Sequence, residues 1–169
     1  MSAEAGSPVT AAAAARLVRA VLRAEGVARA TISLALVGRR RIRALNRRHL
    51  GRDRDTDVIA FCLEAGTGAR GHPNSGRGGT WARGHGYAVV GDVYVCVPVG
   101  AAQARRFDAS PAEEIRRLVV HGVLHVLGYD HPSDGRRTTG PMWRRQEQLL
   151  ARPGRREPGR GTKKGGRTR

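Results

Sequence analysis

The segment that most constrains this chain is a helix-like stretch, residues 110–134, which reads SPAEEIRRLVVHGVLHVLGYDHPSD. It begins with Ser110, Pro111 and Glu113, which are residue types that cap and start a helix. Its apolar residues recur at helical spacing, which predicts one buried face. Gly128 favours a left-handed backbone conformation that ends the helix, so the chain is expected to reverse direction there.

Three histidines stand in this segment at the spacing H-x-x-x-H-x-x-x-x-x-H, namely His121, His125 and His131. Residues four apart share one side of a helix, so His121 and His125 are expected one turn apart, with His131 arriving from the turn beyond. Three imidazoles in this layout leave the fourth corner of a tetrahedron for water, which is typical of a catalytic rather than a structural zinc. A lone histidine in a helix is usually a packed or surface residue, but three at this spacing indicate a metal site.

Gly122 separates this pattern from that of the zinc proteases. Their H-E-x-x-H motif places a glutamate, the general base, directly after the first histidine. Here that position is a glycine. The ligand spacing is therefore protease-like while the base is missing, which argues against peptide hydrolysis.

The formal net charge of the 169-residue chain is +17, which favours polyanionic partners. Nucleic acid or a ribosome is the expected partner, because no long apolar run or basic amphipathic anchor favours a membrane. Cys62 and Cys96 stand in apolar, strand-like surroundings and are predicted to be buried free thiols. Together with the lack of an export signal at the N-terminus, they indicate a cytoplasmic protein.

The remaining segments alternate between helix-like and strand-like patterns. Helices are expected at residues 10–25, 39–49, 101–107 and 142–151, and strands at residues 30–37, 57–63 and 87–99. No doubly wound periodicity or phosphate-binding glycine motif accompanies them. The predicted fold is α/β (α+β): a single compact domain, residues 1–151, in which a small mixed β-sheet is packed with helices and a central helix carries the metal site.

Two segments are expected to stay outside this packed domain. Residues 64–86 are dominated by glycine and arginine and predict a flexible insertion, in which His72 and His85 are solvated rather than ligands. Residues 152–169 hold eight Lys and Arg against one Glu and predict a disordered basic tail that contacts RNA without specificity.

Arginines form two candidate RNA-binding regions. In the predicted helix 39–49, arginines surround a short apolar stripe, so its outer face is either a solvated surface or one that faces RNA. In the loop that follows, Arg52 and Arg54 alternate with aspartates. This loop either holds phosphates through its arginines or forms only turns and local ion pairs.

Three aspartates, Asp57, Asp92 and Asp130, are candidates for a general base by their position alone. Asp92 also follows Gly91 within an apolar run, which suggests a β-bulge or a close backbone approach. It is therefore a candidate partner for a histidine ligand, with a turn-stabilising aspartate as the alternative.

Several segments together resemble the YbeY family of bacterial metal-dependent endoribonucleases that act on ribosomal RNA. HGVLHVLGYDH at residues 121–131 resembles the family signature. IRALNRRHL at 42–50, TDVIAF at 56–61, GDVYV at 91–95 and M-x-x-x-x-E at 142–147 fall in the family's order. The resemblance therefore covers most of the chain, from about residue 11 to residue 150.

The resemblance implies that His121, His125 and His131 hold one Zn²⁺ per chain and act in catalysis through a water on that ion. It also implies cleavage of single-stranded RNA in 16S ribosomal RNA 3′-end maturation and ribosome quality control, with the small ribosomal subunit as a partner.

The chain departs from the family pattern at several positions between residues 50 and 62. Leu50 stands where some members have an arginine important for activity, so Arg52 or Arg54 is a candidate substitute for substrate binding. Asp55 and Cys62 stand where prolines are common, and Ala60 stands where serine is common.

The leading hypothesis is metal-assisted cleavage of an RNA phosphodiester. A second is a non-catalytic ribosome- or RNA-binding factor with a structural zinc, which predicts salt-sensitive binding without turnover. A third is a protease-like metallohydrolase, which only the ligand spacing favours.

Overall fold

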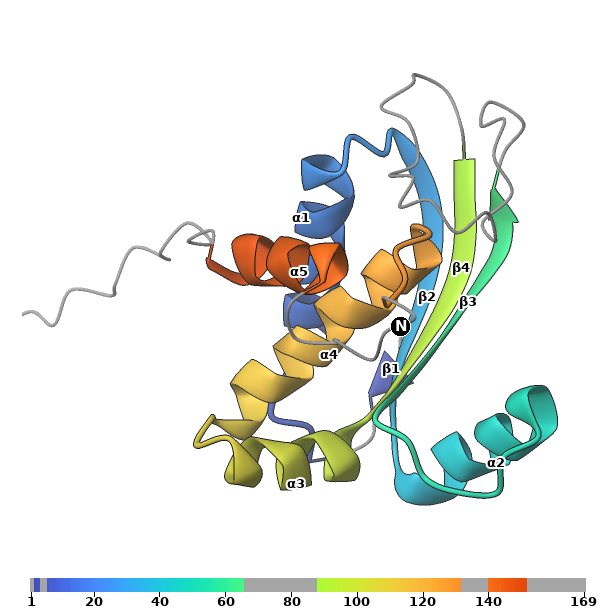
Figure 1. Ribbon diagram of the computed structural model, residues 1–169, viewed down its shortest axis with the longest axis vertical. Helices are drawn as coiled ribbons and strands as arrows, with labels where there is room; N and C mark the ends of the chain where they lie inside the picture. Colours follow the sequence, from blue (N-terminus) through green and yellow to red (C-terminus); the bar gives the residue numbers. More distant parts are fainter. Residues whose placement is uncertain (1, 4–5, 66–87, 132–139, 152–169) are drawn as a thin grey trace, which may run out of the picture.

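The computed structural model describes residues 2–3, 6–65, 88–131 and 140–151, and Figure 1 shows its arrangement. The elements in chain order are β1 (Ser2–Ala3), α1 (Ala11–Ala24), β2 (Arg29–Val37), α2 (Arg39–Leu50), β3 (Val58–Ala65), β4 (Ala88–Cys96), α3 (Val97–Arg106), α4 (Pro111–Val126) and α5 (Pro141–Ala151). The sheet has the order β1-β2-β4-β3. Its β1/β2 and β2/β4 pairs are parallel and its β3/β4 pair is antiparallel, so the prediction of a mixed sheet is confirmed.

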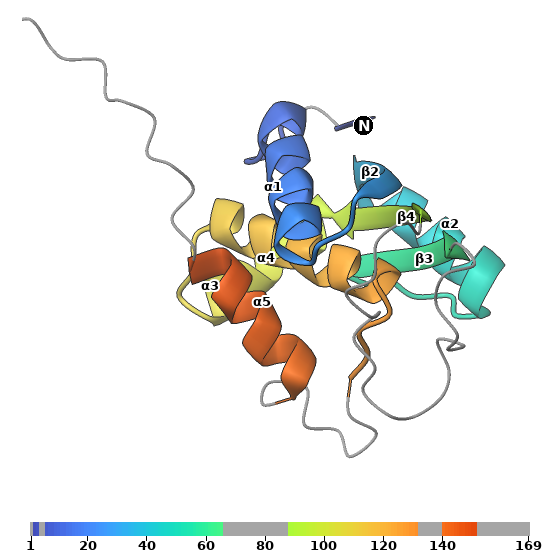
Figure 2. The same ribbon diagram turned by 90° about the horizontal axis from the view of Figure 1, so that it is seen from above.

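Helices cover both faces of this sheet. Helix α4 lies against β3 and β4, with α1 and α5 packed on α4, whereas α2 lies on the opposite side of the sheet (Figures 1 and 2). The larger apolar core joins α1, α4 and α5 to one sheet face. A smaller cluster that includes Ile42, Leu45 and Ile59 holds α2 to the other face. The single α+β domain with a central helix is confirmed.

Helix α4 begins and ends where its sequence predicts. The Ser110 hydroxyl accepts a hydrogen bond from the Glu113 backbone N–H at 3.2 Å, and the Glu113 carboxylate accepts one from the Ser110 N–H at 2.9 Å. This reciprocal pair satisfies backbone donors that the first helical turn leaves unbonded. At the other end Gly128 takes a left-handed φ of 84°, which turns the chain away from the helix axis.

Two glycines let α4 approach the sheet closely. A β-carbon on Gly122 would lie 2.5 Å from Cγ1 of Val93, and one on Gly91 would lie 2.4 Å from Cγ1 of Val126. A side chain at either position would force the helix and strand apart. The predicted close backbone approach at Gly91 is therefore confirmed. Because Gly122 faces β4, a side chain at this position would point into the core.

The structure corrects several predicted boundaries around β3 and β4. Strand β4 ends at Cys96, and α3 starts at Val97 rather than at residue 101, with Pro98 in its first turn, where proline suits a helix. Strand β3 continues to Ala65, so Glu64 and Ala65 belong to the sheet rather than to the predicted insertion. The extra residue of the irregular pairing lies on β3, between Cys62 and Glu64, opposite Gly91 and Val90 rather than on β4 itself. The short strand β1 was not predicted.

Cys62 is exposed, so the prediction that its thiol is buried is wrong, whereas Cys96 is buried as expected. The difference follows from position, because β3 lies at the edge of the sheet and its pairing shifts beside Cys62. The predicted tail 152–169 and most of the predicted insertion, with His72 and His85, lie outside the described residues and stay predictions. Within the described ranges, none of the helices has the length and apolarity needed to cross a membrane.

Candidate metal centre

The three histidines of the signature segment converge. One ring nitrogen from each of His121, His125 and His131 lies within 4.8 Å of the others, and all three side chains are partly buried. His121 and His125 come from α4, one turn apart, and His131 comes from the chain beyond Gly128. The two helical histidines present Nε2 atoms 3.1 Å apart. The predicted convergence is therefore observed.

Hydrogen bonds at the opposite ring nitrogens fix the tautomers of the helical histidines. His121 Nδ1 lies 2.8 Å from the amide oxygen of Gln146, and His125 Nδ1 lies 3.0 Å from the backbone carbonyl of Tyr129. Both partner oxygens can only accept, so each Nδ1 must carry the proton and donate it. Each Nε2 then presents a lone pair, which is the form of imidazole that binds a metal ion.

The donor set fits a divalent metal ion. Tetrahedral zinc with Zn–N bonds of about 2.05 Å brings its nitrogen ligands to about 3.3 Å from one another. The 3.1 Å between the Nε2 atoms of His121 and His125 is close to that value. Two lone pairs facing each other at this distance repel unless a cation lies between them. Imidazole nitrogens suit zinc and other late first-row metals.

The electrostatics keep His125 ready to act as a ligand. Burial first, and then repulsion from His121 and His131, lowers the pKa of His125 from 6.5 to about 4. Both causes disfavour the imidazolium form. At neutral pH the ring is therefore neutral, and a metal ion does not have to displace a proton from it.

The histidines lie in an open pocket of about 500 Å³ between α4 and the loop before β3. Arg52, Asp57 and Asp130 also line it. Asp130 is exposed, and its carboxylate accepts a hydrogen bond from the backbone N–H of His131 at 2.7 Å. The pocket therefore combines three imidazoles, a guanidinium group and two carboxylates at one opening.

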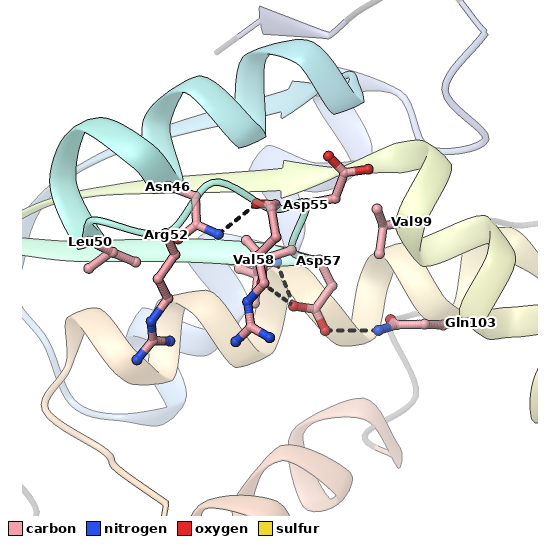
Figure 3. A pocket seen from close by; sticks show the side chains of 10 residues that line it. Asn46, Leu50, Arg52, Asp55, Asp57, Val58, Val99 and Gln103 are labelled. Atoms are coloured by element: carbon pink, nitrogen blue, oxygen red, sulfur yellow. Dashed lines mark hydrogen bonds between the residues drawn. The ribbon is translucent and has the colours of Figure 1, made fainter.

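A second pocket of about 390 Å³ adjoins the first and shares Leu50, Arg52, Thr56, Asp57 and Val58 with it. Figure 3 shows this groove between α2, α3 and the start of β3, with Arg52 pointing away from α2. Because the two pockets share a wall, the surface beside the histidines continues as one groove.

Asp57 is held rigidly at the junction of the two pockets. One carboxylate oxygen accepts from the Val58 backbone N–H at 2.8 Å, and the other accepts from the Gln103 amide at 3.0 Å (Figure 3). Its backbone carbonyl also accepts a 2.7 Å hydrogen bond from the Cys96 N–H. These contacts tie the loop to β4 and α3 and fix the wall of the groove.

The alternating charges of the loop take part both in ion pairs with α2 and in the lining of the groove, and Asp55 does both. Asp53 and Asp55 turn back to α2, where they pair with Arg43 at 2.8 Å and Arg39 at 2.6 Å. Arg54 lines the second pocket, and Arg52 lines both. The predicted local ion pairs are therefore present, whereas phosphate binding by Arg52 and Arg54 stays a prediction.

Asn46 anchors this loop from inside α2. Its side chain is only 2% exposed and donates a 2.8 Å hydrogen bond to the backbone carbonyl of Arg54. The two arginines are thus carried on a fixed backbone, although their guanidinium groups reach solvent. Leu50, also at the groove, is 49% exposed.

Asp92 lies on the opposite face of the sheet from the histidines. Its neighbours Gly91 and Val93 face α4, and side chains alternate along a strand, so Asp92 faces the other way. Its carboxylate accepts from the Tyr94 hydroxyl at 3.5 Å, and Tyr94 packs beside the α2 cluster. The prediction of Asp92 as a histidine partner or general base is therefore wrong, whereas Asp57 and Asp130 line the metal pocket.

Gln146 is the site residue that the sequence reasoning missed. It is 1% exposed and bonds His121, although it lies on a helix that was predicted only to pack over α4. Its signal was present, because Met142 and Gln146 are four apart and share the buried face of α5. A polar residue on a buried helix face needs a hydrogen-bond partner, and His121 supplies one.

Known proteins match this chain along most of its length. Residues 3–154 match the family model described as Endoribonuclease YbeY. An Endoribonuclease YbeY of Moorella thermoacetica is 39% identical over 138 residues, which are 80% of this chain and 81% of the relative. Another, of an Anaeromyxobacter species, is 41% identical over 135 residues; these are 79% of this chain but 59% of the relative, so the chain spans less than two thirds of its length.

A solved structure also has a similar fold. The solution structure of TM1509 from Thermotoga maritima matches with a TM-score of 0.52 and 22% identity, over 88% of this chain and 85% of that one. At this identity the likeness concerns the fold alone. The family, by contrast, is established by the match to its model over nearly the whole sequence and by relatives more than 30% identical. The chain belongs to the YbeY family.

Proposed function

We propose that this protein is a metal-dependent endoribonuclease that cleaves single-stranded RNA, with His121, His125 and His131 holding one Zn²⁺. The observation that carries the proposal is the 3.1 Å separation of the Nε2 atoms of His121 and His125, in a pocket that Arg52 also lines. The names of the relatives, Endoribonuclease YbeY, support RNA as the substrate. The net charge of +17 supports a polyanion as well.

The residues of the groove have distinct roles in this proposal. A divalent ion bound by the three histidines would polarise a phosphoryl oxygen or lower the pKa of a water molecule. Arg52, at the metal pocket, binds the scissile phosphate and offsets the charge that develops on it. Arg54, in the adjoining pocket, binds a neighbouring phosphate and sets the path of the strand.

Asp57 and Asp130 are the remaining candidates for a general base. Asp57 accepts hydrogen bonds from the Val58 N–H and the Gln103 amide, which fix its carboxylate at the edge of the metal pocket. Asp130 is exposed beside His131, where one carboxylate oxygen already accepts a hydrogen bond. The nucleophile is either water or the substrate 2′-hydroxyl. Analysis of the product ends distinguishes them, since attack by the 2′-hydroxyl leaves a 2′,3′-cyclic phosphate.

The proposed cellular substrate is the 3′ end of 16S ribosomal RNA, and the proposed partner is the small ribosomal subunit in the cytoplasm. The family resemblance supports this assignment, as do the exposed arginines of α2, such as Arg40, Arg47 and Arg48. They are carried by α2, which lies on the other side of the sheet from α1, α4 and α5 (Figure 1). Arginines clustered on one helix are a recurring feature of surfaces that bind nucleic-acid backbones.

The test measures cleavage of a ribosomal RNA fragment, once as a single strand and once as a duplex. Each substrate is assayed with the untreated protein, with a chelator present, and after Zn²⁺ is added back. The proposal predicts cleavage of the single strand only, loss with chelator, and loss in His121→Ala and His125→Ala. His49→Ala is the matched control, because His49 is an exposed histidine on α2. If both α4 variants cleave as well as the wild type, the proposal is wrong.

The same experiment separates the other two hypotheses. An RNA-binding factor with a structural ion would bind the fragment with a steep salt dependence and show no turnover. A protease-like hydrolase would need a base where Gly122 stands, and a side chain there would meet Val93 in the core. The position of Gly122 therefore weighs against peptide hydrolysis.

A further inference from the structure

Gln146 of α5 is a buried amide with a fully defined orientation. Its side-chain nitrogen donates to the Glu147 carboxylate at 3.2 Å, and its oxygen lies 2.8 Å from His121 Nδ1. Because a carboxylate only accepts, the amide nitrogen must face Glu147. The amide oxygen is thereby left to face His121.

Glu147 is itself fixed from α4. Arg117 donates to the same carboxylate oxygen that accepts from Gln146. The Arg117 guanidinium also approaches Glu114 at 3.4 Å and lies 5.5 Å above the Trp143 ring. With contacts on three sides, Arg117 has little freedom to leave the carboxylate.

These contacts form one polar line along the α4/α5 interface. Arg117 and His121 are one turn apart on α4, and Trp143 and Glu147 are one turn apart on α5. Gln146 connects the two ends of the line, and its 1% exposure means that water does not replace either partner. A buried polar group is costly unless it is bonded, so packing alone would favour an apolar residue here.

We propose that Gln146 is a positioning residue of the metal centre, which holds His121 in the Nδ1–H tautomer with its Nε2 directed at the ion, and that Glu147 and Arg117 set the amide orientation. This inference rests on the proposed metal site. The opposite tautomer of His121 would place an N–H where the ion must bind. Partners of this kind typically change metal affinity by about 10–100-fold when they are removed.

The test compares Gln146→Leu, Gln146→Glu and Gln148→Leu in the full chain, by competition for Zn²⁺ against a chelator of known affinity. Gln146→Leu, which has no acceptor, should bind about 10–100-fold more weakly. Gln146→Glu keeps an acceptor oxygen for His121 but loses the amide N–H that Glu147 accepts, so it should bind more weakly than the wild type and more tightly than Gln146→Leu. Gln148→Leu is the matched control, since Gln148 is exposed on the same helix. Equal affinity in the wild type and Gln146→Leu would overturn the inference, as would equal losses in Gln146→Leu and Gln146→Glu.

A second readout uses the metal-free protein. Nitrogen NMR of the His121 ring should show a protonated Nδ1 in the wild type and a mixture of tautomers in Gln146→Leu. If Gln146→Leu does not fold, Glu147→Ala replaces it, because it leaves the amide in place but frees its orientation. Glu147→Ala should give the same mixture and weaker Zn²⁺ binding, and an unchanged ring would refute the inference.

Both readouts are made without RNA, so they separate this inference from the proposed function. A wild type that binds Zn²⁺ but cleaves no RNA would refute the nuclease and leave the role of Gln146 standing. A wild type that binds no metal ion would refute both.

Discussion

Gly122 on α4 lies so close to Val93 on β4 that a β-carbon on the glycine would come within 2.5 Å of the valine Cγ1. His121 precedes this glycine directly, and His125 follows it by one turn. The depth at which α4 sits on the sheet therefore also sets where the two imidazoles lie. The packing of α4 on the sheet and the positions of the two imidazoles therefore depend on the same contact between Gly122 and Val93.

Gly122→Ala should destabilise the fold. The added methyl group costs about 1–3 kcal/mol of strain, which outweighs the gain of about 1 kcal/mol in helix propensity. Chemical denaturation measures the net loss in the free energy of unfolding. The affinity for Zn²⁺ should also fall, because the added methyl group pushes α4 away from the sheet. Ala20→Gly, at an exposed site of α1, separately measures the difference in helix propensity between alanine and glycine. A Gly122→Ala variant more stable than the wild type would contradict the packing described here.

Zn²⁺ should stabilise the folded protein. A ligand that binds only the native state adds RT ln(1 + [L]/Kd), about 2.7 kcal/mol when its concentration is 100 times Kd. Thermal unfolding with and without Zn²⁺ measures this gain, with His49→Ala expected to behave like the wild type. His125→Ala should lose the shift in melting temperature. If its shift matches that of the wild type, the ion binds elsewhere.

The metal-free protein should lose stability in mild acid through His125. Its pKa is lowered from 6.5 to about 4 in the folded state, so between these values the unfolded chain binds more protons than the native one. His125 therefore does not lower the free energy of unfolding above pH 6.5, and it lowers it progressively as the pH falls below that value. The decline reaches about 3 kcal/mol near pH 4.

Urea denaturation in chelator at pH values from 7 to 4 measures this decline, and the comparison with His125→Gln isolates it from other groups. The variant should show a shallower pH dependence. Identical curves for the wild type and His125→Gln would mean that burial of this imidazole does not control acid stability.

Arg52→Gln should slow RNA cleavage more than Arg54→Gln does. Arg52 lines the pocket of the histidines, where loss of a group that stabilises developing charge costs about 10²-fold in kcat. Arg54 lines only the adjoining pocket, so its loss should mainly raise KM. Steady-state kinetics on a short single-stranded RNA separate the two effects.

The control for these variants is Arg105→Gln, which removes the same charge from the exposed end of α3. It should change only the salt-dependent part of binding. Equal effects of all three substitutions would show that total charge, rather than the groove, directs RNA to the site.

The histidine segment was predictable because its signals are local. The capping box of Ser110 and Glu113 and the stop at Gly128 depend on residues a few positions apart. The spacing of His121 and His125 likewise fixes their relative position on any helix. These features form from neighbouring residues, whatever the rest of the fold does.

The features that were missed depend on residues far apart in the sequence. The start of α3 was misplaced because Val97 and Val99 extend the apolar pattern of β4. The exposure of Cys62 follows from the edge position of β3, and the role of Gln146 follows from α5 packing on α4. The spacing of Met142 and Gln146 places Gln146 on the buried face of α5, but it does not identify His121 as the partner.

The most direct test measures metal content and RNA cleavage on one preparation. Elemental analysis of the purified wild type should give one divalent ion per chain, and this preparation should cut single-stranded ribosomal RNA. The double variant His121→Ala/His125→Ala, folded by circular dichroism, should contain no ion and leave the RNA intact. Cleavage at the wild-type rate by the metal-free double variant would contradict the account.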